Sequence, residues 1–401
     1  MAVIARRTSS ERSPHQAKYA FGPAVRLEVE GSRLARSHFA AEFGPQLADD
    51  VMEPDLKVIV RLASHPRLPG ASVTGGGGYK TARWRLALSD PDSRPLRAVL
   101  GLFGAPASFA LSLVQGYVVE PLVAIALARA GFIALPSAGV AGEDGAILLM
   151  GRSGSGKSSV CMRLVARGVA VLSDDQIVLD RRGGCWPYPR RFRVYPDLRE
   201  TATAAWTTLP PRARRALALR RAASRLTRGY VAPSLAVSPA VLGAVAIRGP
   251  VAACRLVVIQ RDPAVAQLTA RERHADWLLF EARASLLEQR AHLAALVGTS
   301  WREAINAAVE AELSTFRAAA SAVSVTEVVL PQGWNAPRAI AALDDYLVGL
   351  GAGRSAAARR ATGTKQAEQS HLRGHDAKPQ VPDGTRLPAR FSPRWRRPGS
   401  A

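Results

Sequence analysis

Residues 151–158 read Gly-Arg-Ser-Gly-Ser-Gly-Lys-Ser, which is a complete phosphate-binding loop motif. The preceding residues 146–150, Ala-Ile-Leu-Leu-Met, are apolar throughout and predict a short buried strand. Residues 158–166 place apolar side chains on one face of a helix, and Gly168 is a stop signal for that helix. The sequence therefore predicts a strand, a glycine-rich loop and a helix in immediate succession.

The loop composition predicts a site for a nucleoside triphosphate with Mg²⁺. Its glycines let successive backbone N–H groups point at a polyphosphate, and the helix N-terminus adds a partial positive charge. Lys157 can reach the β- and γ-phosphates, and the Ser158 hydroxyl can enter the coordination shell of Mg²⁺. A Gly/Ser turn that matches by accident is the alternative, but here every fixed position of the motif stands between a strand and a helix. The residues expected to bind ATP are Gly151, Arg152, Ser153, Gly154, Ser155, Gly156, Lys157, Ser158 and Ser159.

A pair of acids follows the next predicted strand. Residues 169–172 are apolar and lead into Ser173, Asp174 and Asp175. In a parallel sheet this strand can lie beside the strand of the loop, so that the acids reach the same edge. One carboxylate would serve a magnesium site, and the second would accept the proton of an attacking hydroxyl. An isolated Asp-Asp pair would only solubilise a turn, but its place one helix after a phosphate loop favours the functional interpretation.

Residues 151–180 resemble the catalytic domain of HPr kinase/phosphorylase and of HPr-kinase-like proteins. The resemblance rests on Gly-x-Ser-Gly-x-Gly-Lys-Ser, a helix that ends in Arg167-Gly168, and the Asp-Asp pair. A looser similarity in the order of strands and helices extends over about 135–350. The resemblance implies an α/β fold with a P-loop nucleotide-binding domain of the HPr kinase/PEP carboxykinase-like type.

The resemblance also implies residue roles and an activity. Lys157 would contact the transferring phosphoryl group, Ser158 would ligate Mg²⁺, Asp174 would support the metal or its waters, and Asp175 would be the proton acceptor. The implied enzyme is an ATP-dependent phosphotransferase of the serine kinase type. Because HPr kinases form hexamers, the resemblance also allows a homo-oligomer.

Two departures from the family pattern bear on the substrate. Relatives carry a His upstream of the loop, and its register falls here on Pro136, which has no titratable group. The second family signature, Leu-Glu-x-Arg-Gly, has no counterpart; Glu200 is the nearest acid, and we assign it no metal role. HPr is therefore not the expected substrate. The acceptor would be another hydroxyl, either a Ser/Thr of a protein or peptide or a small alcohol.

Three function classes compete. The first is the kinase, and the second is an ATP-binding regulatory or accessory protein that transfers nothing, which the departure at Pro136 supports. The third is a transport or mechanical ATPase, which is disfavoured because no Leu-Ser-Gly-Gly-Gln signature and no strand-end Asp-Glu pair follow the loop.

Composition indicates a cytoplasmic protein without a membrane span. The 401 residues suffice for one large and one smaller domain. The three cysteines have neither metal-ligand nor paired spacing, and the N-terminus lacks the long apolar stretch of a signal peptide. The most apolar region, 96–141, is interrupted by polar residues and by proline, and it predicts buried helix and strand.

The net charge of +22 is concentrated in two segments. Residues 353–401 hold eleven Lys/Arg against three Asp/Glu, with few apolar side chains, and predict a disordered, solvated tail. Residues 190–228 hold eleven Arg against Asp197 and Glu200, and within them 212–228 form an arginine-rich amphipathic pattern interleaved with Leu217, Leu219 and Leu226. Such a helix is either a docking surface for an acidic peptide, nucleic acid or membrane, or a solvated face, and the sequence leaves both open.

The chain divides by composition into four segments: a loose N-terminus (1–20), a β-rich module (21–95), the nucleotide domain (96–350) and the tail (351–401). In the module, alternating patterns predict strands at 25–29, 56–62 and 82–88, with a flexible turn at 74–78.

The later sequence predicts one hairpin, two strands and three helices. The hairpin joins 176–180 to 186–194, strands are expected at 254–260 and 325–330, and helices at 272–296, 301–320 and 337–350. Core positions expected in the first of these helices are Trp277, Leu278, Leu286, Leu287 and Leu293.

Overall fold

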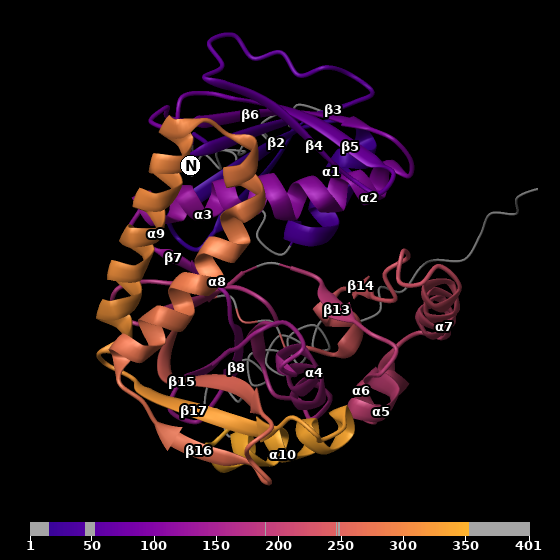
Figure 1. Cartoon of the computed structure of the whole chain (residues 1–401), viewed down its shortest axis with the longest axis vertical. Coiled ribbons are helices and arrows are strands. Elements are labelled where there is room, and N and C mark those ends of the chain that lie inside the picture. The colour runs from indigo at the N-terminus through magenta and orange to yellow at the C-terminus, as the bar shows by residue number, and fades with distance from the viewer. Residues whose placement is uncertain (1–15, 45–52, 189, 246, 248, 353–401) are drawn as a thin grey trace, which may run out of the picture. The chain divides into compact units, whose positions relative to one another are not determined.

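A computed structural model describes residues 16–352 of the chain apart from 45–52, 189, 246 and 248. These residues form a mixed α/β fold with a six-stranded sheet, a nine-stranded sheet and a two-stranded ribbon (Figure 1). Most of the predicted loose N-terminus and the predicted tail from residue 353 onward lie outside the described residues.

The six-stranded sheet is formed by the N-terminal part of the chain and has the strand order β1-β2-β3-β6-β5-β4. Its strands are β1 (Gln16–Phe21), β2 (Val25–Gly31), β3 (Leu56–Leu62), β4 (Val73–Tyr79), β5 (Ala82–Leu88) and β6 (Leu96–Phe103). The strands predicted at 25–29, 56–62 and 82–88 are confirmed. The sheet is longer in sequence than the predicted module at 21–95. It begins with β1 at residue 16, and it includes β6, which follows residue 95 and lies between β3 and β5.

The prediction of a flexible turn at 74–78 is wrong. These residues lie in the edge strand β4, which pairs antiparallel with β5. A Cβ atom on Gly77 would lie 2.7 Å from the Trp84 ring, and one on Gly75 would lie 2.7 Å from the carbonyl oxygen of Leu296. The glycines therefore allow a side chain and the end of a helix to approach the strand closely. A run of glycines looks the same in the sequence whether it serves close packing or a flexible turn, which is why the prediction failed.

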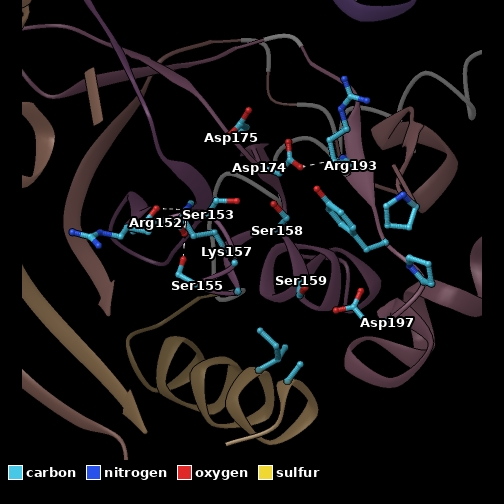
Figure 2. A pocket seen from close by; sticks show the side chains of 18 of the residues that line it. Arg152, Ser153, Ser155, Lys157, Ser158, Ser159, Asp174, Asp175, Arg193 and Asp197 are labelled. Atoms are coloured by element: carbon cyan, nitrogen blue, oxygen red, sulfur yellow. Dashed lines mark hydrogen bonds between the residues drawn. The ribbon is translucent and has the colours of Figure 1, made fainter. Parts of the chain in front are cut away.

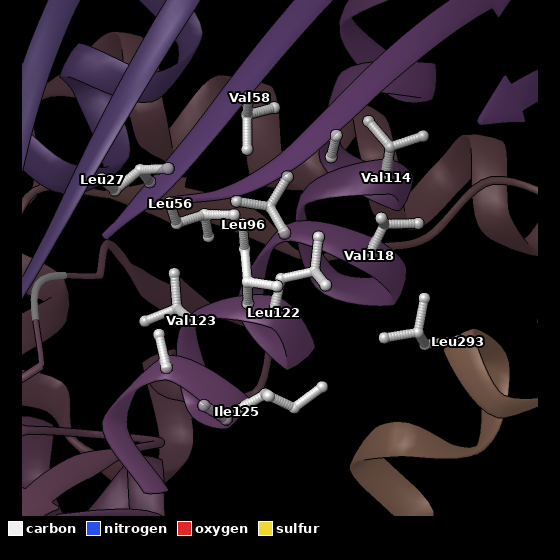
Figure 3. Close-up of a cluster of buried hydrophobic side chains, with 14 of the residues drawn as sticks. Leu27, Leu56, Val58, Leu96, Val114, Val118, Leu122, Val123, Ile125 and Leu293 are labelled. Atoms are coloured by element: carbon white, nitrogen blue, oxygen red, sulfur yellow. The ribbon is translucent and has the colours of Figure 1, made fainter. Parts of the chain in front are cut away.

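An apolar helical run packs against this sheet (Figure 3). It comprises α2 (Ala107–Val114), a π-helical turn (Gln115–Val119) and α3 (Glu120–Arg129). By length and composition the run could cross a membrane, but 78% of its most apolar window is buried inside the protein. This burial is typical of a core helix and supports the prediction of buried structure in 96–141. Helix α1 (Arg33–Phe43) contributes Phe39 and Phe43 to the same core.

The nine-stranded sheet carries the glycine-rich loop. Its main path is β10-β8-β9-β15-β12-β11-β7, with β17 paired to β15 and β16 paired to β17. The strands are β7 (Ile133–Leu135), β8 (Ala138–Ala141), β9 (Ala146–Met150), β10 (Val171–Ser173), β11 (Ile177–Leu179), β12 (Gly184–Pro187), β15 (Val251–Asp262), β16 (Thr269–Glu272) and β17 (Ser324–Pro331). The strands predicted at 146–150, 254–260 and 325–330 are confirmed as β9, β15 and β17.

Two predictions about strand pairing need correction. The predicted hairpin is confirmed as β11 and β12, but its last residues form a separate strand, β13 (Phe192–Val194), which pairs with β14 (Leu235–Val237). The strand before the acid pair, β10, does not lie beside β9, because β8 lies between them and is antiparallel to both. Strands β9 and β10 therefore run in the same direction and end at the same edge of the sheet.

Helices cover both faces of this sheet, and the side chains of β9 alternate between them. Ile147 and Leu149 share a core with α4 (Lys157–Ala166) and α10 (Ala336–Gly349). Leu148 and Met150 share a core with α8 (Ala275–Leu296) and α9 (Thr299–Ala320). A strand buried on both faces reads as a continuous apolar run, which explains its clear sequence signal. All four helices were predicted within a few residues of their observed bounds.

Helices α8 and α9 also contact the first sheet. Leu293 is buried in the core of that sheet, and the Trp301 indole N–H donates to the Ser72 hydroxyl at 3.2 Å. Of the core positions predicted in α8, Leu278, Leu286 and Leu293 are buried and Trp277 is partly buried. Leu287 is 42% exposed, so that prediction is wrong.

Candidate functional site

The glycine-rich loop connects β9 to α4 in a backbone conformation that requires glycine. Gly151, Gly154 and Gly156 have φ angles of 143°, 80° and 107°, which side-chain-bearing residues rarely adopt. A Cβ atom would lie 2.5 Å from the Ile259 carbonyl oxygen at Gly151, and 2.5 Å from Ile340 Cδ1 at Gly156. Helix α4 has no side-chain cap at its N-terminus. Its first-turn N–H groups are thus available to an anion.

Lys157 lies over the loop from which it projects. Its Nζ donates to the carbonyl oxygens of Gly151 and, at 3.2 Å, of Arg152, and it lies 3.5 Å from the Ser155 hydroxyl. Burial lowers the pKa of Lys157, and the nearby Asp175 carboxylate opposes that shift. The loop backbone and this ammonium group together make a site suited to phosphate oxygens.

The acid pair at the end of β10 lines the same pocket as the loop (Figure 2). Asp174 is only 2% exposed, and its Oδ1 is buried without a hydrogen-bond partner. Burial, together with the charge of Asp175, raises the pKa of Asp174 to about 7. The Asp175 side chain is 52% exposed and pairs with the Arg190 guanidinium. The two carboxylates therefore differ strongly in environment: Asp174 is buried and Asp175 is half-exposed. Such a difference is expected where one acid supports a metal ion and the other accepts a proton.

A buried polar chain, which sequence reasoning missed, leads from Asp175 into the protein. Arg190 also lies 3.5 Å from the buried Glu120 carboxylate. Glu120 accepts from the Gln115 side-chain amide at 2.8 Å, and the Gln115 Oε1 lies 2.7 Å from the His38 Nε2. Burial raises the pKa of Glu120 and lowers that of His38. The sequence signal for this chain is Glu120, a single carboxylate in a largely apolar helix. The sequence pattern alone indicates only that a polar residue interrupts the apolar region 96–141.

The double role of Arg190 predicts a non-additive effect on stability. Arg190→Met should lower the free energy of unfolding by on the order of 3 kcal/mol, because it leaves a buried carboxylate without its cation. Adding Glu120→Gln should recover part of this loss, since it removes the uncompensated charge. Denaturant unfolding of both single variants and the double variant measures the coupling.

Arg283→Met is the control, because it breaks the exposed pair between Arg283 and Glu310. It should cost at most about 1 kcal/mol. Additive losses for Arg190→Met and Glu120→Gln would contradict a coupled buried chain.

The pocket has a volume of about 850 Å³ and is bounded by several parts of the chain. Besides the loop and the acid pair, its walls come from the segment around β13, from α7 (Pro211–Leu226), and from α8 and α10. Pro136, between β7 and β8, lines it, and none of the described residues that line it is a His. Glu200, to which the sequence analysis assigns no metal role, lines it too.

The oxygen ligands of the pocket fit Mg²⁺. Within the described part of the chain, no group of three or more His, Cys, Asp or Glu could hold a metal ion. Mg²⁺ does not need such a group, because it binds through one or two protein oxygens, substrate phosphates and waters. Asp174, whose Oδ1 has no hydrogen-bond partner, and Ser158 both line the pocket and carry oxygen ligands of this kind.

All the residues predicted to bind nucleotide or metal, Gly151 to Ser159 with Asp174 and Asp175, line this one pocket. No protein-family model matches the chain, and no curated protein matches it. The functional argument therefore depends on the residues of this pocket.

Proposed function

We propose that the protein is an ATP-dependent kinase of the HPr-kinase-like type, with a P-loop nucleotide domain, that phosphorylates a hydroxyl group. The acceptor would be a Ser/Thr of a protein or peptide, or a small alcohol, and HPr itself is not the expected substrate. One observation carries the proposal: a glycine-rich anion-binding loop and an acid pair, contributed by β-strands that end at the same sheet edge, line one pocket.

In the proposed reaction the loop N–H groups and Lys157 bind the triphosphate and stabilise the charge that develops on it. The acceptor oxygen forms a bond to the γ-phosphorus while the bond to the β–γ bridging oxygen breaks, and ADP leaves. The proton of the acceptor hydroxyl passes to the Asp175 carboxylate. Arg190 holds that carboxylate at the pocket through its ion pair. Ser158 and Asp174 would hold Mg²⁺, which would supply neutralisation of the charge on the phosphates.

The test is transfer of label from γ-³²P ATP, with Mg²⁺, to peptides, proteins or metabolites of a cell extract. A labelled product that depends on the purified protein supports the kinase. If no peptide or metabolite is labelled although ATP binds, the kinase proposal fails.

We also propose a cytoplasmic location, where ATP is available and Cys161, Cys185 and Cys254 remain as the free thiols observed.

The second candidate is an ATP-binding regulatory or accessory protein that transfers nothing. Two observations favour it: Pro136 lines the pocket at the position where the resemblance implies a His, and Asp175 is already paired with Arg190. Under this alternative, Asp175→Asn alters the binding of a partner, and no phosphorylated product exists.

The environment of Asp174 predicts a pH dependence of magnesium-assisted nucleotide binding. Burial and Asp175 raise the pKa of Asp174 to about 7, so the carboxyl is protonated and neutral below that pH. At low Mg²⁺ concentration the affinity for nucleotide should therefore rise as pH increases through about 7. Calorimetry with a non-hydrolysable ATP analogue measures this, and Asp174→Asn should reduce the dependence to the part that comes from the terminal phosphate of the nucleotide itself. An equal pH dependence in Asp174→Asn would contradict the assignment.

A further inference from the structure

Helix α7 carries a concentration of positive charge that forms no ion pair within the described part of the chain. It was predicted at 212–228 and spans Pro211–Leu226, with Leu217 as its one buried residue. Residues 211–229 contain no Asp or Glu. Among the described residues, none of the ion pairs involves an arginine of this helix. The arginines of the segment are Arg212, Arg214, Arg215, Arg220, Arg221, Arg225 and Arg228.

One side of this helix forms a wall of the pocket. Arg221, Ser224 and Arg225 line the pocket that also contains the glycine-rich loop and Asp175. Helical spacing places Arg214 on the same side, seven residues before Arg221. The pocket-facing stripe is thus basic along its length.

The opposite side of α7 is basic as well but faces away from the pocket. Arg212 and Arg215 lie there by helical spacing, and neither lines the pocket. Leu219 and Leu226, on the same side, are 72% and 86% exposed. The helix therefore provides both a candidate binding surface and a matched set of arginines outside it.

The neighbouring wall carries charges of both signs, because Arg193, Asp197 and Glu200 all line the pocket there. Arg193 lines the pocket and forms no ion pair among the described residues, and burial together with the nearby Arg190 lowers its pKa. Tyr195 and Pro196, which follow Arg193, also line the pocket. Arg193 and the arginines of α7 suit an anionic ligand. The Tyr195 and Pro196 side chains beside them suit a ligand that also has apolar atoms to pack against the pocket wall.

The triphosphate does not account for these arginines, because its binding groups are the loop N–H groups and Lys157. A peptide fits the remaining wall better than a nucleic acid does. A Ser or Thr side chain on an extended peptide can enter the pocket toward Asp175 while flanking carboxylates pair with α7. A nucleic acid duplex is too broad to enter a concave pocket of about 850 Å³.

We propose that Arg221 and Arg225 bind acidic side chains that flank the phosphorylated Ser or Thr of a peptide acceptor. The inference rests on the proposed kinase function and names the substrate class of its site. Reversal of both charges should weaken binding of an acidic peptide by about 30-fold or more, because two charge-assisted contacts become repulsive.

The experiment uses the full chain and a fluorescein-labelled peptide in which one serine is flanked on both sides by glutamates. Fluorescence anisotropy compares the wild type, R221E/R225E and the matched control R212E/R215E, which has the same change in charge. The expected result is loss of peptide binding in R221E/R225E alone, with ATP binding by calorimetry retained in all three. A peptide with glutamines in place of the glutamates should bind weakly to each of them.

Four outcomes would overturn the inference. Two concern the peptide: R221E/R225E binds it as tightly as the wild type does, or the control R212E/R215E loses as much peptide affinity as R221E/R225E. The other two are that R221E/R225E loses ATP binding in place of peptide binding, or that binding of a single-stranded oligonucleotide depends more strongly on Arg221 and Arg225 than peptide binding does. Because this assay measures peptide binding and not transfer, its result is separate from the labelling test of the kinase. Peptide binding through Arg221 and Arg225 without any labelled product would reject the kinase and leave only a docking surface.

Discussion

Asp175→Asn is expected to reduce the rate of phosphoryl transfer by about 10²–10⁴-fold while leaving ATP binding nearly intact. The amide keeps the size of the side chain but cannot accept the proton of the attacking hydroxyl. Asp175 is half-exposed in the pocket, so the change should cost little stability. The measurement is the initial rate of label transfer from γ-³²P ATP, with calorimetry for nucleotide affinity.

Asp345→Asn is the matched control for this prediction. Asp345 is an exposed acid on α10 that does not line the pocket, so the same chemical change should leave transfer unchanged. Asp175→Asn with a rate close to that of the wild type would contradict the role of Asp175 as proton acceptor. A similar loss in Asp345→Asn would point to a general effect of charge.

Lys157→Ala is expected to weaken ATP binding by about 100-fold. A charge-assisted contact to the phosphates contributes about 3 kcal/mol, and each 1.4 kcal/mol corresponds to about tenfold in affinity. The Lys157 ammonium group lies over the loop, where it contacts the carbonyl oxygens of Gly151 and Arg152. Its loss therefore removes a cation from the place where the triphosphate is expected to bind. Calorimetric titration with ATP measures the change.

Lys57→Ala provides the comparison, because it removes the same group from β3, where Lys57 pairs with Glu28 at 2.8 Å. Lys57 lies outside the pocket, and its removal should leave ATP affinity unchanged. Equal affinities in Lys157→Ala and the wild type would show that the loop does not bind the triphosphate.

The sequence predicts the local parts of this site well. The strand at 146–150, the loop and helix α4 each have a signal within a few residues: a continuous apolar run, glycines at fixed positions, and apolar residues at helical spacing. The helices of the second sheet were predicted for the same reason, since each buries a regular apolar face. The residues of the proposed nucleotide site therefore fall in one pocket, as expected.

The parts that the sequence did not predict depend on long-range pairing. The insertion of β8 between β9 and β10 leaves no local trace, because an apolar strand pairs equally well in either position. The glycines of β4 are explained only by Trp84 and Leu296, which lie on other elements. The chain from Glu120 through Arg190 to Asp175 joins residues that are distant in sequence, so no spacing rule connects them.

The most direct test of the central claim is a crystal structure of the protein with Mg²⁺ and a non-hydrolysable ATP analogue. The account predicts the triphosphate on the N–H groups of the loop and of the first turn of α4, with Lys157 on its phosphates and the γ-phosphate facing Asp175. Electron density for the nucleotide outside this pocket, or a triphosphate whose γ-phosphate is turned away from both acids, would contradict it.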